Sequence, residues 1–232
     1  MAGTTLHLAI ADKIYDKLGD NVIKNLPLFF GGNLAPDAIH AKKDYQREDK
    51  KHSHLCDGIR SYGYGYPEVS KLFKDRVNEF IENYYLPAGD DKELYLGYAV
   101  HLLADEYYLL AVYERLDEHL KSKGINIDAK TLADEVNNHV HSKFFSETSY
   151  ILDISPNEYD FKQNVVDVLE AVWDYEVKDY ITAEEINISK RWIIDNFFKN
   201  DQTKETIDRE LTLKFIDGAA NNIIEQLNDV IR

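Results

Sequence analysis

The sequence predicts an all-α protein that forms one globular domain over residues 1–232. Three observations predict it. Nearly every long segment spaces its apolar residues with the helical period, and no segment alternates as a half-buried strand does. The chain also has no repeat, no low-complexity tract and no linker rich in Pro, Gly and Ser, which favours one continuous domain. We expect roughly seven or eight helices.

Two helices are expected first along the chain. One covers residues 4–18, where Leu8, Ile14 and Leu18 fall on one apolar stripe. The other starts at Pro67, because the N–H that proline lacks would be unpaired in the first turn of a helix anyway. Each of these helices is expected to bury one face in the core.

A long helix is expected around "YLGYAVHLLADEYYLL" (95–110). Asp90 and Glu93 have the spacing of a capping box in front of it, and Gly124 can end it. Its apolar residues cover most of the helix circumference, which predicts a buried position.

Further helices are expected in the second half of the chain, where apolar residues again recur with the helical period. Thr182 and Glu185 have capping-box spacing in front of one of them. We interpret the apolar faces of these helices as parts of the core. The expected ranges are 128–147, 158–180, 183–198 and 204–231.

Residues 28–67 are predicted to be the irregular part of the chain. This segment holds five glycines, two prolines, three histidines and many charged residues. A loop of that length in a compact helical domain is usually functional or disordered. Its apolar ends and its tyrosines favour order, so it is the first place to look for a site.

The charge of the chain limits its partners. With 27 basic and 42 acidic residues, the formal net charge is −15. Such a surface repels the phosphates of nucleic acids and of anionic lipids, so a nucleic-acid partner is not favoured. It leaves open a small phosphate-ester substrate in a pocket where metal cations reverse the local field.

The sequence shows no feature of export. Cys56 is the only cysteine, so no internal disulfide can form and nothing indicates an oxidising compartment. Residues 1–19 lack the basic and unbroken apolar regions of a signal peptide, and no apolar run approaches the ~20 residues of a membrane span. We expect a cytoplasmic protein without an integral membrane segment.

His101 and Asp105 are unusual residues for the long helix. They are four apart and therefore share one helix face, one turn above the other, among apolar neighbours. A carboxylate in such surroundings is costly unless it is paired or binds a cation. A His–Asp hydrogen bond inside the core and a shared metal ion are both open explanations.

Three further residues have the same ambiguity. His7 lies among apolar residues of the first helix, Asp37 ends the turn-like "GGNLAPD", and His54 lies in "KHSHLCD". Singly, they are explained as a core histidine, a helix N-cap and a solvated loop residue. Three histidines and two aspartates together are a sensible ligand set for zinc or a similar divalent ion.

Four motifs, "LHLAIAD", "GNLAPDA", "HSHLCD" and "GYAVHLLADEYY", follow one another in residues 4–110. Their order and spacing resemble the zinc-dependent phospholipase C family, whose all-helical superfamily also contains zinc-dependent single-strand nucleases. The resemblance implies that Asp37, His54, His101 and Asp105 hold one metal, and that His7 and Asp105 contribute to a second. Asp105 would then bridge the two metals. We expect one or two zinc ions, and other divalent metals remain open.

The chain departs from that family in two respects. The family's secreted enzymes use an N-terminal tryptophan as a ligand of the second metal, and no tryptophan lies near this N-terminus. The family's third metal needs a histidine where this chain has Ala111, and then a His-x-x-x-Glu that is absent. Glu135, His139 and His141 are weaker candidates for such a site; a solvated surface pair is their simpler explanation.

The resemblance implies a metal-dependent phosphoesterase in which a metal-activated water attacks a phosphodiester or phosphomonoester. We assign Asp105 and Asp57 to its catalytic group. Asp57 and Asp12 would each orient an imidazole or act as a general base. The alternative is that they are exposed carboxylates of a loop or a helix. Tyr62, Tyr64 and Tyr66 of "SYGYGYPE" are candidates for substrate binding, although packing also explains tyrosines.

Two other functions compete with this one. A helical metal-binding or interaction protein that kept the fold but lost turnover would explain the missing ligands of the third metal. A nucleotide phosphohydrolase of the His-Asp type ranks last, because that class needs an adjacent His-Asp dipeptide and the chain has none. The sequence does not determine the oligomeric state.

Overall fold

The protein is all-α, as predicted. The computed structural model describes residues 2–59, 67–126, 128, 131–132, 152–172, 174–200 and 205–231. Within these residues β-type pairing is limited to a single bridge between Val177 and Ile181, and no described helix is long and apolar enough to cross a membrane. The eight α-helices found in this part of the chain are α1 (Thr4–Leu18), α2 (Leu26–Ala38), α3 (Arg47–Ser53), α4 (Pro67–Phe80), α5 (Lys92–Ser122), α8 (Val165–Glu170), α9 (Ala183–Ile193) and α10 (Arg209–Ile231).

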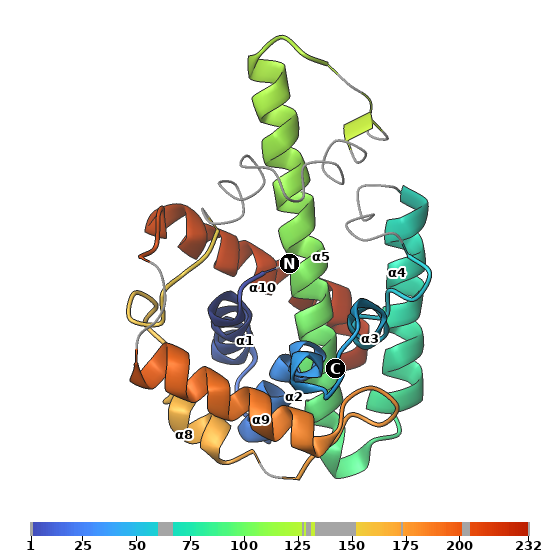
Figure 1. Cartoon of the computed structure of the whole chain (residues 1–232), viewed down its shortest axis with the longest axis vertical. Coiled ribbons are helices and arrows are strands. Elements are labelled where there is room, and N and C mark those ends of the chain that lie inside the picture. Colours follow the sequence, from blue (N-terminus) through green and yellow to red (C-terminus); the bar gives the residue numbers. More distant parts are fainter. Residues whose placement is uncertain are drawn as a thin grey trace.

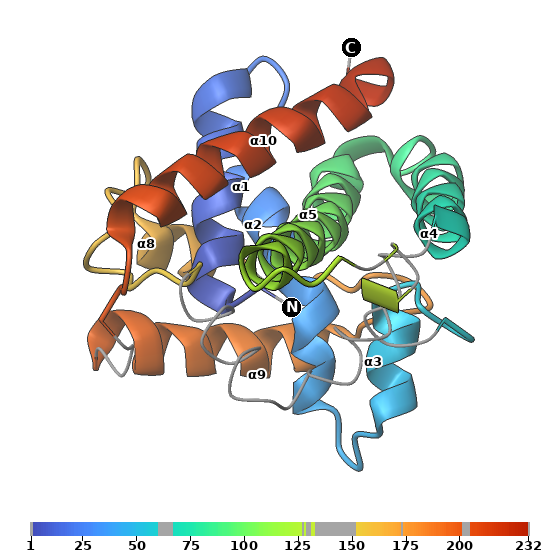
Figure 2. The same ribbon diagram turned by 90° about the horizontal axis from the view of Figure 1, so that it is seen from above.

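Helix α5 runs along the longest axis of the molecule (Figure 1). Seen from above, α1 and α10 lie on one side of it and α4 on the other (Figure 2). Helix α2 packs against α5 and against α9, which runs across the lower part of the view in Figure 1. The core is formed where these helices meet, so side chains of α1, α2 and α5 that point inward approach one another.

The contact between α2 and α5 is made by backbone atoms. A Cβ added to Gly32 of α2 would lie 1.8 Å from the carbonyl oxygen of Leu94, and one added to Gly97 of α5 would lie 2.0 Å from that of Phe29. Neither position accepts a side chain, because real Cβ atoms never approach so closely. The two helices are therefore held at a fixed, short separation.

The prediction that residues 28–67 are irregular is wrong over α2 and α3. The glycines of "FFGGNLAPD" do not form a turn; Gly32 instead allows the close contact with α5. Pro36 lies inside α2, where its lack of an N–H removes one helical hydrogen bond without ending the helix. Asp37 is consequently a residue of α2 and not an N-cap.

Two other predictions about helix ends are also wrong. Among the described residues of the expected helix 158–180, only Val165–Glu170 are α-helical; the helix starts late because Asn164 caps it there, accepting a 3.4 Å hydrogen bond from Asp167 N–H. Helix α5 starts without a side-chain cap, since the carboxylate of Glu93 accepts a hydrogen bond from Lys24 N–H instead.

Several other predicted features are confirmed. Residues 4–18 form α1, and Pro67 begins α4. Thr182 and Glu185 form the predicted capping box of α9. Gly124 follows the end of α5 with a φ of 75°, a conformation that favours glycine. Most of the helix expected over 128–147 lies outside the described residues.

Candidate metal centre

Helix α5 carries His101 and Asp105 into the middle of the molecule. The two residues are 1% and 2% exposed. Oδ1 of Asp105 accepts a hydrogen bond from Ala2 N–H at 2.9 Å and lies 3.3 Å from Nε2 of His7. Oδ2 lies 3.7 Å from Nε2 of His54 and 3.9 Å from Nε2 of His101. One carboxylate therefore faces three imidazoles.

Backbone carbonyl groups fix two of these imidazoles. Nδ1 of His101 lies 2.8 Å from the carbonyl oxygen of Asn33, and Nδ1 of His54 lies 3.0 Å from that of Lys50. A carbonyl oxygen only accepts hydrogen bonds, so Nδ1 carries a proton in each ring, and in the neutral form of such a ring Nε2 keeps a free lone pair. This tautomer is the one that presents Nε2 to a metal ion.

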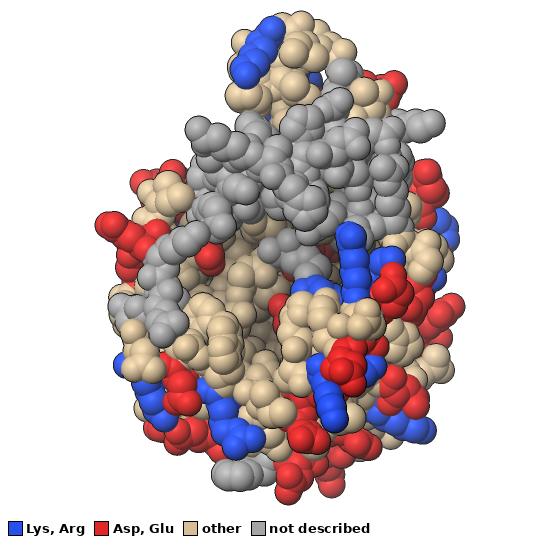
Figure 3. Space-filling model, in the orientation of Figure 1, with Lys and Arg blue, Asp and Glu red and all other residues tan. Residues whose placement is uncertain are grey.

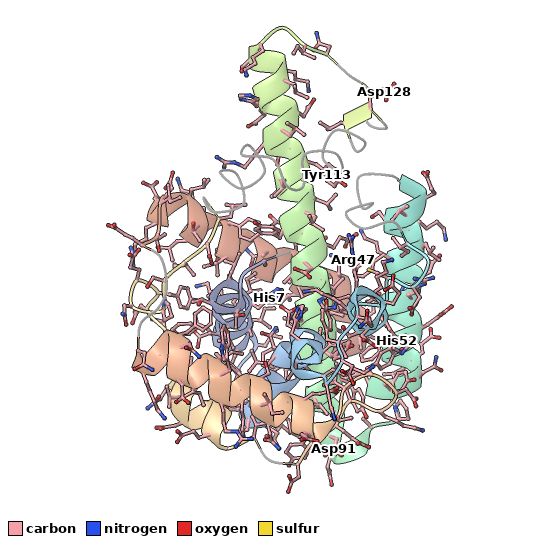
Figure 4. All side chains as sticks on the ribbon, in the orientation of Figure 1. His7, Arg47, His52, Asp91, Tyr113 and Asp128 are labelled. Carbon is pink, nitrogen blue, oxygen red and sulfur yellow. The ribbon has the colours of Figure 1, made fainter. Side chains whose placement is uncertain are left out.

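His7 lies between α1 and α5 (Figure 4) and is 1% exposed. Its ring is stacked on that of His101, with ring centroids 3.7 Å apart and an angle of 5° between the planes. Two imidazoles packed this closely in the core cannot both be charged at low cost. The stack therefore disfavours the simultaneous protonation of both rings, and a neutral imidazole is the form that ligates metals.

Asp37 forms the outer edge of the group and its side chain is 26% exposed. One of its oxygens lies 3.4 Å from Nε2 of His54 and accepts a hydrogen bond from Nζ of Lys50 at 2.7 Å. The same ammonium lies 3.0 Å from Nε2 of His40. Asp37 thus faces the imidazoles on one side and a fixed cation on the other.

The electrostatics give these groups the protonation states of metal ligands. Burial, together with the neighbouring His7, lowers the pKa of His101 to about 3. Burial acts to raise the pKa of Asp105 and of Asp37. The facing groups outweigh it, with His7, His101 and the N-terminal amine acting on Asp105 and with His54, His101 and the Lys50 ammonium acting on Asp37, so each pKa lies below its ordinary value. At neutral pH His101 is therefore neutral and both carboxylates are ionised.

Five polar atoms of this group have no hydrogen-bond partner in the described structure. They are Nε2 of His7, His54 and His101, Nδ1 of His7, and Oδ2 of Asp105. A buried polar atom without a partner costs about 1–3 kcal/mol, so five in one place are a large destabilisation unless something binds them. Imidazole nitrogen and carboxylate oxygen are ligands that zinc prefers.

The ligand atoms are also close enough to share an ion. Those of His7, His101 and Asp105 lie within 4.8 Å of one another, and so do those of Asp37, His54 and His101. The structure thus brings together all five residues that the sequence predicted as ligands, and the donor set fits one or two divalent cations.

A cavity of about 400 Å³ adjoins the group. His7, Asp37 and His101 line one wall, and α9 contributes the opposite wall with Ile188 and Trp192. Figure 3 shows a hollow of mostly uncharged atoms above α9, with charged residues around it. The helical spacing of the apolar residues of α9 predicted a core position for them. Trp192 is 56% exposed and lines the cavity, so part of this face borders the cavity instead.

The remaining predicted residues divide into two groups. Asp57 is exposed and pairs with His52, whose Nδ1 lies 2.8 Å from its carboxylate, and the structure does not join it to the five residues above. Asp12 is buried on α1 and accepts a hydrogen bond from Lys162 N–H. Those that lie outside the described residues are Tyr62, Tyr64, Tyr66, Glu135, His139 and His141.

The five clustered residues lie within one stretch that can be compared with known families. Residues 6–108 match the family model of zinc-dependent phospholipase C. The match confirms the resemblance found in the motifs, and it includes every residue of the cluster. No curated protein and no solved structure matches the chain. Helix α9 and its wall of the cavity lie beyond the residues that match the family.

Proposed function

We propose that the protein is a metal-dependent phosphoesterase that hydrolyses a phosphodiester or a phosphomonoester. The observation that carries the proposal is the buried group of unpaired ligand atoms on His7, His54, His101 and Asp105. The match of residues 6–108 to zinc-dependent phospholipase C supports it, because that family hydrolyses phosphoric esters with zinc.

In this proposal Asp37, His54 and His101 hold one ion, and His7 holds a second. Asp105 would contribute to both, since its Oδ1 faces His7 while its Oδ2 faces the other two imidazoles. A divalent ion at such a site lowers the pKa of water toward neutrality and so supplies a hydroxide that can attack phosphorus.

The residues of the chain would contribute orientation and charge. The carbonyl oxygens of Asn33 and Lys50 hold His101 and His54 in one ring orientation, which removes the cost of reorganising them. The ammonium of Lys50 pairs with Asp37, which lines the cavity, and so reduces the negative charge that an entering phosphoryl group would meet there. The side chains of the ligands exclude bulk water, which strengthens these interactions.

The cavity indicates where the organic part of the ester would lie. Among the residues described as lining it there is no Lys or Arg, and the wall opposite the histidines is apolar, with Ile188, Trp192 and Ile193. An uncharged alcohol group fits this wall better than a second anionic group. Asp57 and the tyrosines at 62, 64 and 66 remain predictions from the sequence, as does the cytoplasmic location.

A helical metal-binding protein without turnover is the second candidate. The observation in its favour is Ala111, which stands where the family's third metal would need a histidine. Metal binding is common to both candidates, so the rate of hydrolysis separates them.

The test begins with chelator-treated protein reloaded with zinc. We expect one or two equivalents of zinc by elemental analysis and zinc-dependent hydrolysis of bis-p-nitrophenyl phosphate or p-nitrophenyl phosphate. His101→Ala should lose both. His119→Ala, on the same helix but outside the cluster, is the matched control and should keep both. Full zinc occupancy in His101→Ala would contradict the assigned ligands, and zinc without hydrolysis of either ester would favour the second candidate.

A further inference from the structure

Asn33 lies at the junction of the two helices that carry most of the ligands. It precedes Asp37 by four residues on α2 and therefore shares its face of the helix. Its carbonyl oxygen is the acceptor for His101, and it lines the same cavity as His7. The close contact at Gly97 fixes its backbone, because a Cβ added there would lie 2.8 Å from Asn33 N.

The side chain of Asn33 is an anomaly. The residue is 0% exposed, and neither Oδ1 nor Nδ2 has a hydrogen-bond partner in the described structure. An amide buried without partners costs several times more than an apolar side chain of the same size, such as leucine. A fully buried asparagine in this state therefore needs a partner that the protein chain does not supply.

The metal centre offers a partner of suitable chemistry, since Asn33 lines the same cavity as His7, Asp37 and His101. The triad of His7, His101 and Asp105 offers only three protein ligands, and one of them, His101, also belongs to the neighbouring group, whereas zinc usually takes four ligands. An amide oxygen is a neutral ligand that divalent cations accept. We infer that Asn33 belongs to the proposed metal centre and supplies Oδ1 as an additional ligand.

This inference rests on the metal-binding part of the proposed function and deepens it. It also explains the position of the residue, since the carbonyl of Asn33 orients His101 while its side chain completes the ion's surroundings. The amide has a second conceivable role, in which Nδ2 donates a hydrogen bond to a water molecule. The two roles differ in what an aspartate at position 33 would do, because aspartate keeps the oxygen but has no N–H.

The experiment compares Asn33→Leu and Asn33→Asp with the wild type. Zinc affinity is measured by competition with a chromophoric chelator, and thermal unfolding is followed with and without zinc. Asn33→Leu should bind zinc about tenfold or more weakly, a loss of the size that follows changes around a metal ligand. Its metal-free form should unfold at the same or a higher temperature than the metal-free wild type, because the unpaired amide is gone. Asn33→Asp should bind zinc at least as tightly as the wild type.

Asn25→Leu is the matched control for this pair. Asn25 caps α2 by accepting a hydrogen bond from Leu28 N–H, so its loss should lower the unfolding temperature and leave zinc affinity unchanged. Should Asn33→Leu fail to fold, Asn33→Ala gives the same comparison with a smaller side chain and the same expected loss of affinity.

Three outcomes would be decisive. Wild-type zinc affinity in Asn33→Leu, or in its alanine replacement, would overturn the inference and leave the proposed function intact. A loss in Asn33→Asp equal to that in Asn33→Leu would also overturn it, in favour of the Nδ2 role. A wild-type protein that binds no zinc would instead refute the proposed function itself.

Discussion

His52 and His54 lie two residues apart at the end of α3. They differ in their exposure and in the hydrogen bonding of their ring nitrogens, the two properties that decide whether a histidine can ligate a metal. His52 is half exposed, and both ring nitrogens have partners, at 2.8 Å in Asp57 and at 3.3 Å in the carbonyl of Asp179. His54 is 3% exposed, and its Nε2 has no hydrogen-bond partner in the described structure. The exposed histidine is fully bonded, and the buried one is not.

The same difference separates two polar regions of the core. In the region of His52, the hydroxyl of buried Tyr98 donates a hydrogen bond to the carbonyl oxygen of Ser53, and the hydroxyl of Tyr84 donates one to Asp179 at 3.0 Å. These tyrosines pack with Phe80 in an aromatic group whose buried hydroxyl is paired. The metal-centre residues leave five buried atoms unpaired. Buried polar groups that are all hydrogen-bonded indicate a structural role. Several neighbouring buried groups without hydrogen-bond partners indicate a binding site.

The largest effect is expected at the carboxylate that faces all three imidazoles. Asp105→Asn keeps the shape of the side chain but removes its charge and replaces one oxygen by a donor, so zinc affinity should fall by about 100-fold or more. Chelator competition measures it. A variant that keeps wild-type affinity would show that the unpaired atoms around Asp105 are not a metal site.

The next effect concerns pH and the metal-free protein. Burial lowers the pKa of His101 to about 3, far below that of an unfolded histidine, so the unfolded chain binds more protons as the pH falls below about 6.5. The free energy of unfolding should therefore decrease from about pH 6.5 toward pH 3, by up to about 1.4 kcal/mol per pH unit for this group. Urea unfolding at a series of pH values checks this.

His101→Gln provides the control for that pH series. The variant lacks the titrating ring, so its free energy of unfolding should decrease less steeply over the same interval. Parallel pH profiles for the variant and the wild type would show that His101 is not held neutral by the fold.

A smaller effect is expected in the fully bonded region. Tyr98→Phe removes the donor to the carbonyl of Ser53 and should reduce the free energy of unfolding by about 1–2 kcal/mol. Zinc affinity should stay within about twofold of the wild type, because the hydroxyl is structural. Denaturant unfolding and chelator competition on the same variant test both parts. A large loss of zinc would mean that the two regions are coupled.

The smallest effect is expected at Asp12, a buried carboxylate on the helix of His7 with one unpaired oxygen, Oδ1. Burial raises its pKa, so the folded state holds a proton more tightly than the unfolded state, and the stability linked to that proton is lost as the pH rises. Asp12→Asn keeps the acceptor for Lys162 N–H and removes this loss.

We expect Asp12→Asn to be more stable than the wild type at pH 7 by less than about 1 kcal/mol, with unchanged zinc affinity. Unfolding curves at pH 5 and pH 7 measure the difference, which should grow with pH. A fall in zinc affinity would extend the metal centre along α1 and weaken the distinction drawn above.

The sequence predicted the fold class and the clustering of five residues for different reasons. Helical periodicity along residues 4–18 and 95–110 is a local signal, and local signals survive folding. The five residues were chosen because polar groups stood among apolar neighbours and because of the family motifs. The distances among His7, His54 and Asp105 bear out their convergence, while their role as ligands remains a proposal.

What the sequence did not predict depends on contacts between distant segments. Gly32 and Pro36 are typical of turns, and only the approach of α5 explains why they belong to a helix. Asn33 resembles a turn residue in "GGNLAPD" and becomes unusual only once its burial is known. Trp192 has the spacing of a core residue, and its position on the cavity follows from how α9 packs on α2.

The backbone contact between α2 and α5 has an implication for how this site can change over time. Asp37 belongs to α2 and His101 to α5. The separation of these two helices is set at Gly32 and Gly97, where a hydrogen atom takes the place of a side chain. Single substitutions can replace the ligand residues on these two helices during evolution, and the chemistry of the site can change with them. The distance between the two helices cannot change in small steps, because no residue is smaller than glycine and any larger residue at these positions would force the helices apart.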